Sequence, residues 1–588
     1  MLPPLFEMDD YASCIDNKHS FCKLEAQLYG KDNDSPIWRS IKESSENEKL
    51  MDRSILHRGF CIPRQDAKDL ESVKSFSEML IDKEIGPMNL TSEVNVLVCF
   101  DNDFSMTSYD QLVILIIMIY SGLILFATLY SMTKTKVVGV SRLVSVFSLY
   151  HNWRKRTTPI DNADYGKLKS MQGIRFYCLL LVLMAHTKLS YGMVYLSNPS
   201  FLEQVASKPL LSYVNILDVF IVQPYFMISS WLLTIQIINV SRNHEEFNIK
   251  QVGAIILNRY FRLAVSLGVV IALFNTSMAR YVGGPLNIEN ALLHEEACRN
   301  NWFKTILFIN NFQFVIDACN PIAWYLAADF QMYVFNTFTF YLVIKYKLNA
   351  FRTFSILMAI ASVLYGIIIF VYDMDIIFKP SIRNMEYRIL SRSILFLITY
   401  QSTISVFGCC SVGVILGLIY VRNKDKTVKI DNITTFSWSA IFLGLPLLVI
   451  LISRQEYRGV SAALLGPLVK PLYVLGIGIG ILGMSFGIGG FLKKICELRF
   501  VTIMGNFNYC IYICHLPICF MRPNDILLPI EVGYFKMIED YLKVIVKSVT
   551  IGIIMTLAVE EPGISLQKMM LPQIERNISE KKLRKHEK

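Results

Sequence analysis

Three common sequence features are missing from this chain. The first 110 residues contain no apolar run long enough to cross a membrane, and the opening MLPPLFEMDDYASC has neither the basic stretch nor the apolar stretch of a signal peptide. No Gly-rich, Ser-rich or repeated segment interrupts the remainder. No His, Cys and Asp residues stand at metal-ligand spacing. We therefore expect neither a repeat architecture nor a metal site.

The rest of the chain is unusually apolar. Of 588 residues, 53% are hydrophobic, and the mean hydropathy is +0.41, whereas soluble domains are normally negative. The net charge is +10, and in a membrane protein such an excess lies in cytoplasmic loops rather than at a nucleic-acid site. We therefore predict a polytopic integral membrane protein whose surroundings are membrane lipids, and no nucleic-acid partner.

About eleven apolar segments are long enough to be membrane-spanning helices. The predicted spans are 112–132, 174–194, 214–240, 258–278, 323–345, 353–373, 396–421, 435–453, 467–489, 500–520 and 542–559. The predicted fold class is an all-α polytopic membrane protein with a small disulfide-bonded N-terminal domain outside the cytoplasm. Its expected parts are an N-terminal cysteine-bearing domain at 1–110, a first transmembrane helix at 111–133, a basic cytoplasmic linker at 134–168, a membrane domain at 169–565 and a basic cytoplasmic tail at 566–588.

Basic residues in short loops indicate the orientation, because they favour the cytoplasmic side. Acidic residues precede the first span, and the residues after it are basic: Lys134, Lys136, Arg142, Arg154, Lys155 and Arg156. Alternation then makes every predicted inside loop basic, with the N-terminus outside and the C-terminus in the cytoplasm. Either the first span inserts with its N-terminal end outside, or a signal peptide is missing from this form. We expect the host membrane to be the plasma membrane or the endoplasmic reticulum.

The same orientation sorts the cysteines and the glycosylation sequons. Six cysteines fall outside, an even number that three disulfides would need: Cys14, Cys22, Cys61, Cys99, Cys298 and Cys319. We expect Cys298 to pair with Cys319, since both lie in one loop, while the four N-terminal cysteines allow three connectivities. Free thiols in a reducing compartment are the alternative. Asn33 and Asn89 are the sequon asparagines that fall outside and could be glycosylated.

Ionisable residues inside predicted spans are candidates for function, because charge in lipid is costly. Arg175 and His186 stand eleven positions apart, which places both on nearly one helix face and about 16 Å apart along the axis. Arg259 and Arg262 are one turn apart near the predicted inner surface and could clamp a phosphate. The ordinary alternatives are membrane anchoring for the arginines and packing for His186. Further intramembrane candidates are Tyr325, Asp329, His515, Glu560 and Glu561.

These residues stand in a pattern that resembles the acyltransferase-3 family. That family carries an Arg and a His ten intervening residues apart, an Arg-x-x-Arg pair, a Tyr-x-x-His-x-Pro-like segment and a terminal Glu-x-Pro. The segments MDDYASC, HSFCKLEAQLY, IWRSIKES and ILHRGFC are similar to the N-terminal domain of the "nose resistant to fluoxetine" proteins, which join a cysteine-bearing domain to an acyltransferase-3 membrane part. The similarity continues through GGPL (283–286), CRNNWF (298–303), INNF (309–312) and AWYLAADFQ (323–331).

The resemblance implies acyl transfer from cytoplasmic acyl-CoA, as co-substrate and without another cofactor, to a hydroxyl of a lipid or other small hydrophobic acceptor. His186 would act as general base, Arg175 would orient the donor or stabilise the oxyanion, and Arg259 with Arg262 would hold the donor phosphates. One departure stands at Gln223, where the family usually has an acid. A carrier for lipids or small hydrophobic molecules is the competing class, and a receptor-like binding protein is a third. The sequence leaves the oligomeric state open.

Overall fold

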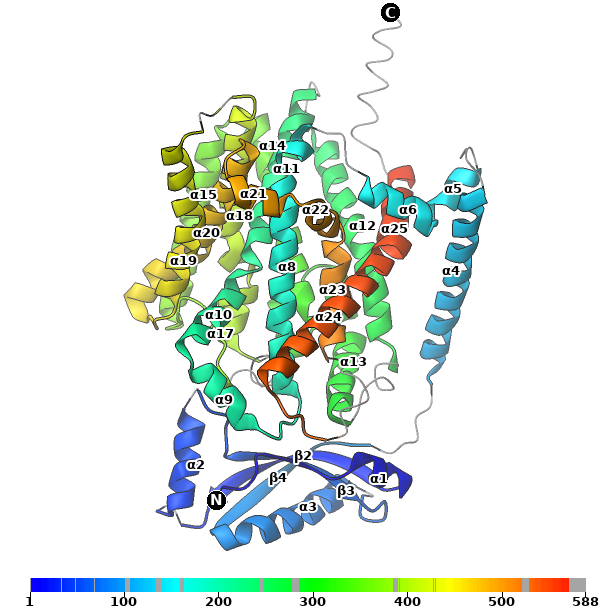
Figure 1. Cartoon of the computed structure of the whole chain (residues 1–588), viewed down its shortest axis with the longest axis vertical. Coiled ribbons are helices and arrows are strands. Elements are labelled where there is room, and N and C mark those ends of the chain that lie inside the picture. The colour runs from blue at the N-terminus through cyan, green and yellow to red at the C-terminus, as the bar shows by residue number, and fades with distance from the viewer. Residues whose placement is uncertain are drawn as a thin grey trace, which may run out of the picture.

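The computed structural model describes residues 2–570 except 33, 48, 68, 101–105, 134–139, 159–162, 244–246, 278–284, 384–389, 391, 427, 429 and 521–527. Within that part, a small α/β domain is stacked on one end of a bundle of long helices (Figure 1). We call the end of the bundle that this domain covers, where α8 (Lys169–Leu189) finishes, the capped end. The opposite end, where α8 begins, is the open end.

The N-terminal domain contains a sheet rather than helices alone. Its strands β1 (Phe6–Met8), β2 (Ser20–Gly30), β3 (Ile55–Ile62) and β4 (Leu90–Phe100) lie in the order β1-β3-β2-β4, and β2 runs antiparallel to both of its neighbours. Helices α1 (Tyr11–Asp16), α2 (Pro36–Glu46) and α3 (Leu70–Ile85) complete it. Leu24, Ala26 and Leu28 alternate along β2 and are fully buried together with Ile81 of α3. The expectation of an all-α fold is therefore wrong here, because this period of two marks a strand.

Three disulfides pair the six cysteines that the sequence assigned to the outside. Cys14 of α1 bonds Cys61 of β3, and Cys22 of β2 bonds Cys99 of β4. The expected Cys298–Cys319 pair is confirmed and joins α13 (Pro285–Ile306) to the loop after it. Sequon residue Asn89 is exposed at the turn before β4, whereas Asn33 lies outside the described residues.

Charged pairs fix the N-terminal domain on the capped end. Lys23 of β2 and Glu289 of α13 form an ion pair at 2.7 Å although both side chains are buried. Arg53 pairs with Glu203 of α9 (Pro199–Ser207) at 3.1 Å. The hydroxyl of Tyr195 donates to the backbone oxygen of Arg58 at 3.3 Å. Buried ion pairs of this kind hold two bodies in one orientation, because breaking them leaves an uncompensated charge.

Nine helical segments of the described residues are long and apolar enough to cross a membrane: 108–133, 169–192, 211–242, 249–274, 350–371, 394–423, 432–453, 459–485 and 534–570. The expected count of eleven is not confirmed. The expected span 323–345 is the helix α14 (Trp324–Lys345), which carries Asp329, Gln331 and Asn336 and is too polar to be counted. The expected span 500–520 divides into α22 (Arg499–Gly505) and α23 (Asn508–Phe520), and both pieces are short. Both expected spans nevertheless lie inside the bundle (Figure 1).

One boundary error moves a candidate site residue, and it concerns α12 (Ile249–Phe274), which was expected to begin at 258. The side chains of Asn248 and Gln251 form a capping box that starts this helix nine residues earlier. Arg259 therefore lies ten residues, or about 15 Å, inside the helix rather than at its entrance.

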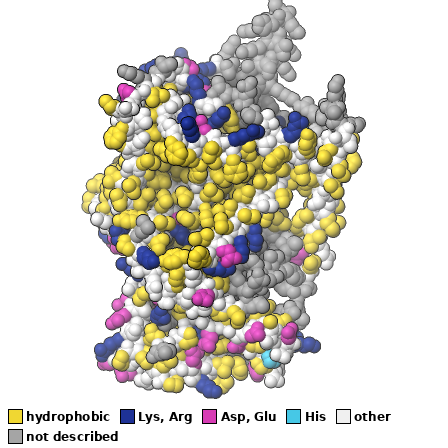
Figure 2. All heavy atoms as spheres, viewed as in Figure 1, with side chains coloured by type: hydrophobic (Ala, Val, Ile, Leu, Met, Phe, Trp, Pro, Cys, Tyr) yellow, Lys and Arg dark blue, Asp and Glu magenta, His cyan; other side chains and the backbone are white. Residues whose placement is uncertain are grey.

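The surface of the bundle carries an apolar band with basic residues along its edges (Figure 2). Helix α4 (Ser108–Thr133) contributes a strongly apolar segment, of which only 17% is buried. An exposed apolar belt of this kind needs lipid as its solvent. The chain is thus an integral membrane protein.

The segment expected to be a linker is largely helical. It contains α5 (Val140–Val146), α6 (Leu149–Thr157) and α7 (Ala163–Lys167), and α6 lies across the open end (Figure 1). At the other end of the sequence, α25 (Glu561–Met570) extends past the expected border of the tail at 566, and residues 571–588 lie outside the described part.

Candidate active site

Two histidines from helices far apart in the sequence meet inside the bundle. His515 of α23 is fully buried, and its Nε2 lies 3.0 Å from Nδ1 of His186 on α8. The Nδ1 of His515 contacts the backbone oxygen of Tyr512. A carbonyl oxygen can only accept, so His515 Nδ1 carries the proton and its Nε2 accepts from Nδ1–H of His186. This chain of donors leaves Nε2 of His186 with a free lone pair.

Close packing fixes the helix that carries His515. Gly552 of α24 (Tyr534–Met555) lies so near α23 that an added Cβ would stand 2.7 Å from the backbone nitrogen of Ile511. On its other side, the hydroxyl of Tyr512 donates to the backbone oxygen of Ile322 at 3.0 Å. The imidazole of His515 is thereby held on both flanks, as an orienting group requires.

A row of tyrosines connects the histidine pair with the arginines. The ring of Tyr512 lies 5.5 Å from that of His515 and 5.5 Å from that of Tyr325, which in turn lies 5.9 Å from Tyr225. The hydroxyl of Tyr225 donates to the backbone oxygen of Arg175 at 2.5 Å. Arg175 itself keeps a buried Nε that has no hydrogen-bond partner among the described residues. An unpaired guanidinium N–H beside these rings is free to bind a ligand oxygen.

Arg259 and Arg262 have different surroundings although they are one turn apart. The guanidinium of Arg259 forms an ion pair with Asp329 of α14, donates to Oγ of Ser229 at 2.9 Å and lies 4.2 Å from the ring centre of Tyr333. Arg262 is exposed, and the charges that act on it most include Glu560 and Arg156. The structure thus places Tyr325 and Asp329 beside the expected donor-binding pair. Arg259 is bound to Asp329 and Ser229, whereas Arg262 is exposed.

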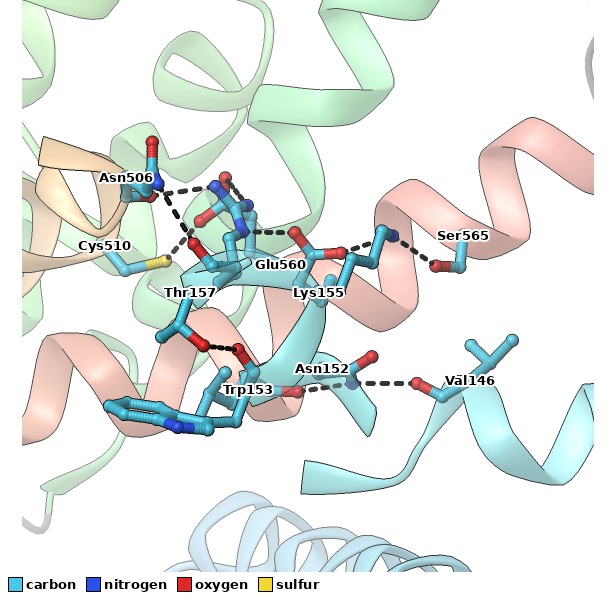
Figure 3. A network of polar contacts seen from close by, with 12 residues as sticks. Val146, Asn152, Trp153, Lys155, Thr157, Asn506, Cys510, Glu560 and Ser565 are labelled. Carbon is cyan, nitrogen blue, oxygen red and sulfur yellow. Dashed lines mark hydrogen bonds and ion pairs between the residues drawn. The ribbon is translucent and has the colours of Figure 1, made fainter. Parts of the chain in front are cut away.

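Glu560 and Glu561 anchor α6 to the bundle (Figure 3). Arg156 contacts both carboxylates, with its Nη2 2.8 Å from Glu560, and Lys155 pairs with Glu561 at 2.6 Å. Arg156 Nη1 also donates to the backbone oxygen of Asn506 at 2.8 Å. Burial disfavours the charge of Arg156, but the two carboxylates outweigh it and raise the pKa of Arg156 above its usual value.

This anchor lies at an irregular stretch of the last span. Glu560 ends η9, a π-helical turn over Thr556–Glu560, and accepts a weak hydrogen bond from Sγ of Cys510. Asn152 of α6 donates at 2.9 Å to the backbone oxygens of both Val146 and Leu557. Turns of this kind occur often at functional sites, and here the turn ends at Glu560, one of the two carboxylates that hold Arg156.

Three residues of this anchor were not predicted as part of a site. In the sequence, Arg156 and Lys155 indicate only the orientation of the chain, and Asn506 carries no signal of its own. Charge complementarity could have predicted the anchor, because the basic WRKR run at 153–156 matches two adjacent glutamates in an otherwise apolar span. Paired carboxylates in lipid need cations from somewhere in the chain.

Gln223 lies apart from this cluster. It is fully buried at the start of α11 (Gln223–Asn243), where its Nε2 donates to the backbone oxygen of Val219 and its Oε1 accepts from Sγ of Cys409. Asp218, five residues earlier, pairs with Lys188 at 2.5 Å. Neither residue has a recorded contact with His186 or His515. Among the described residues, no group of three His, Cys, Asp or Glu side chains is placed to hold a metal ion.

The region that holds the histidine pair, the tyrosines and the arginines coincides with a known domain. The family model Acyl_transf_3, described as an acyltransferase domain, matches residues 168–526, more than half of the chain. The chain belongs to the acyltransferase-3 family. Membership in this acyltransferase-3 family indicates membrane acyl transfer in general. A search of curated proteins gave no significant match, and neither did a search of solved structures. The acyltransferase-3 match ends before Glu560, so the anchor to α6 joins the matched domain to flanking sequence.

Proposed function

We propose that this protein transfers an acyl group from acyl-CoA to a hydroxyl of a lipid or another small hydrophobic acceptor, with His186 as general base. The observation that carries this proposal is the contact between His186 Nδ1 and His515 Nε2, because it leaves Nε2 of His186 free to accept a proton. His515 is a positioning residue that holds the required tautomer of His186.

The reaction follows from this arrangement. The acceptor hydroxyl gives its proton to Nε2 of His186 while its oxygen attacks the thioester carbonyl of the donor. The carbon–sulfur bond then breaks, and the thiolate of CoA takes the proton from His186 and leaves as the thiol. Arg175, with its unpaired buried Nε, stabilises the developing oxyanion or orients the donor. Every atom is accounted for without a further cofactor.

Arg262 lies one turn farther from the open end than Arg259, and its exposed side chain would be open to the donor phosphates. Arg259 is held by Asp329 and Ser229, so its guanidinium is already oriented for a second contact. Guanidinium groups bind phosphates with paired hydrogen bonds, which suits two arginines one helical turn apart.

The open end would face the cytoplasm and the capped end the outside. Basic residues after the first span lie at the open end, and the disulfides of the N-terminal domain suit an oxidising compartment. The N-terminus would then be extracytoplasmic and the C-terminus cytoplasmic, in the plasma membrane or the endoplasmic reticulum. We further propose that the N-terminal domain is of the nose-resistant-to-fluoxetine type and that an acceptor from outside must pass it.

The decisive experiment measures transfer of a labelled acyl group from acyl-CoA to added lipids by the purified protein in detergent micelles. We expect transfer by the wild type and none by His186→Ala, with equal membrane insertion and equal thermal unfolding of the two. Full activity of His186→Ala would contradict the role of His186. Absence of any turnover by the wild type would contradict acyl transfer as a whole.

A carrier for lipids or small hydrophobic molecules is the second candidate, and one buried lysine favours it. Lys470 of α20 (Gly459–Ser485) is 1% exposed and donates to the backbone oxygen of Thr399 and to Oγ of Ser405. These acceptors flank Ser402, where the π-helical turn η8 (Leu397–Gln401) ends and α18 (Thr403–Asn423) begins. Broken helices that meet a buried charge are common in transporters.

Sealed vesicles separate the two candidates. A carrier moves labelled lipid into proteoliposomes without acyl-CoA, and Lys470→Met would stop that movement while Lys470→Arg would retain part of it. An enzyme turns over in micelles, where no compartment exists, and Lys470→Met would leave this turnover in place. Transport that is absent from the wild type would contradict the carrier.

A further inference from the structure

A cavity at the open end lies away from the histidine and arginine cluster. It measures about 710 Å³ and opens between the last turns of α11 and α18 and the first turn of α15 (Ala350–Val371). None of the residues that line it was assigned a role above. Its size is in the range of cavities that bind small ligands or lipid headgroups.

The charged residues that line the cavity are all basic among those described. Arg242 comes from α11, Arg422 from α18, and Lys426 from the segment directly after α18. These three side chains make no ion pair with any described residue. The neighbouring Lys424, in contrast, is neutralised by Asp164 at 3.0 Å. Three cations that have no ion-pair partner among the described residues surround one space and attract an anion, and two guanidinium groups can bind its oxygens in pairs.

Apolar side chains form much of the remaining wall. Ile238, Leu418 and Val421 line the cavity beside the arginines, and Phe351 at its edge is 51% exposed. The space therefore offers cations toward the aqueous side and hydrocarbon toward the bundle. A ligand with a negative headgroup and an acyl chain matches both parts, whereas a free inorganic anion uses only the first.

We propose that this cavity binds the phosphate headgroup of an anionic membrane lipid. Its level supports this, because the cavity lies at the open end of the bundle (Figure 1), and basic residues follow the edge of the apolar band at that end (Figure 2), where headgroups of a surrounding bilayer are found. The bound lipid is separate from both substrates of the proposed reaction. It would hold α11 and α18 together, and α11 also supplies Ser229 to Arg259.

Contact between α11 and α18 explains why such a lipid would matter to the bundle. An added Cβ on Gly413 of α18 would stand only 2.2 Å from the backbone oxygen of Met227 on α11. The two helices are therefore packed backbone against backbone at this point, and the cavity lies farther along both helices, at their open ends. A phosphate that bridges Arg242 and Arg422 would add a link between these ends, and because it binds the folded state it would raise the unfolding temperature.

The test uses the full chain in nanodiscs of phosphatidylcholine alone or of phosphatidylcholine with phosphatidylserine. The cavity variant is R242Q/R422Q/K426Q. The control, K250Q/K347Q/K494Q, removes three exposed charges from the same end but none from the cavity. We expect the wild type and the control to retain phosphatidylserine in native mass spectrometry and to unfold at a higher temperature with it. The cavity variant should bind phosphatidylserine about a hundredfold more weakly, since each of the three basic residues contributes about fivefold.

Each outcome decides the proposal. Equal retention by the cavity variant and the wild type would overturn it, as would an equal loss in the control, because the effect would then be net charge. If inorganic phosphate displaces the lipid from the wild type as effectively as short-chain phosphatidylserine does, the site binds a free anion and the lipid assignment is overturned. Unfolding in phosphatidylcholine alone shows whether the cavity variant folds, and a folded variant that loses only the phosphatidylserine-dependent shift supports the proposal.

Discussion

The imidazoles of His186 and His515 meet at an interplanar angle of 46°, with Nδ1 of the first 3.0 Å from Nε2 of the second. The backbone oxygen of Tyr512 determines the direction of the proton in this pair, because it can only accept from His515. A buried residue in α23 therefore decides which nitrogen of His186 is basic. His515 thus orients His186 in the same way that the carboxylate of a catalytic triad orients its histidine.

The first prediction concerns His515. His515→Leu removes the acceptor for Nδ1–H of His186, and we expect kcat for acyl transfer to fall about 100-fold with KM for the donor little changed. His515→Gln keeps an acceptor oxygen near the same position and should recover part of the loss. Steady-state kinetics of purified variants in micelles measures both. Equal kcat values for the two variants would contradict the orienting role.

The second prediction separates two roles of Arg259, its contribution to the stability of the fold and its contribution to donor binding. Asp329→Ala leaves a buried guanidinium without its partner and should lower the free energy of unfolding by about 3–5 kcal/mol. The double variant R259M/D329M should recover most of that stability and still show a raised KM for acyl-CoA. Thermal unfolding and donor titration measure the two effects separately. If the double variant has the KM of the wild type, Arg259 does not contact the donor.

Arg262→Ala is the matched comparison. Arg262 is exposed and has no recorded ion-pair partner among the described residues, so we expect little change in the unfolding temperature. The KM for acyl-CoA should nevertheless rise about tenfold, because one phosphate contact is lost. A strongly lowered unfolding temperature in this variant would instead indicate a structural role through Glu560.

The third prediction concerns the anchor of α6. Arg156 is largely buried between two carboxylates, so Arg156→Ala should lower the free energy of unfolding by about 3–5 kcal/mol. Lys155 is 38% exposed, and its pair with Glu561 should contribute only about 0–1 kcal/mol. Unfolding in detergent can be monitored through the reaction of a thiol dye with the buried cysteines. It would give the free energy of unfolding of each of the two variants. If the two variants lost the same free energy of unfolding, the explanation by the different burial of the two side chains would be wrong.

The fourth prediction counts thiols. All thirteen cysteines are accounted for, six in disulfides and seven buried and free. Denatured, unreduced protein should bind seven maleimide–polyethylene glycol groups, and reduced protein thirteen. Replacing both Cys22 and Cys99 with serine should leave seven reactive thiols in the unreduced protein. A count of nine in that variant would show that other cysteines had been paired with them.

The sequence predicted those features that depend on local spacing. Arg175 and His186 share a face because helix geometry is fixed over eleven residues, and the Cys298–Cys319 pair lies within one short segment. The contact between His186 and His515 could not be predicted, since these residues are 329 positions apart and meet only through packing. The strands of the N-terminal domain could have been predicted from the alternation of buried residues along β2. The long apolar helices that follow dominate the composition of the chain and favoured an all-α prediction. The expected count of eleven spans is not confirmed, because α14 is too polar and α23 too short to be counted among the apolar helices of the described residues.

The anchor of α6 has a consequence for how the molecule is made. Lys155 and Ser565 are in contact although 410 positions separate them, and Arg156 pairs with Glu560 across 404 positions. During synthesis the cationic helix reaches the membrane surface long before its carboxylate partners exist. Closure of the open end must therefore wait for insertion of the final helix. A chain that ends early would contain most of its spans but would leave Arg156 without the carboxylates of Glu560 and Glu561.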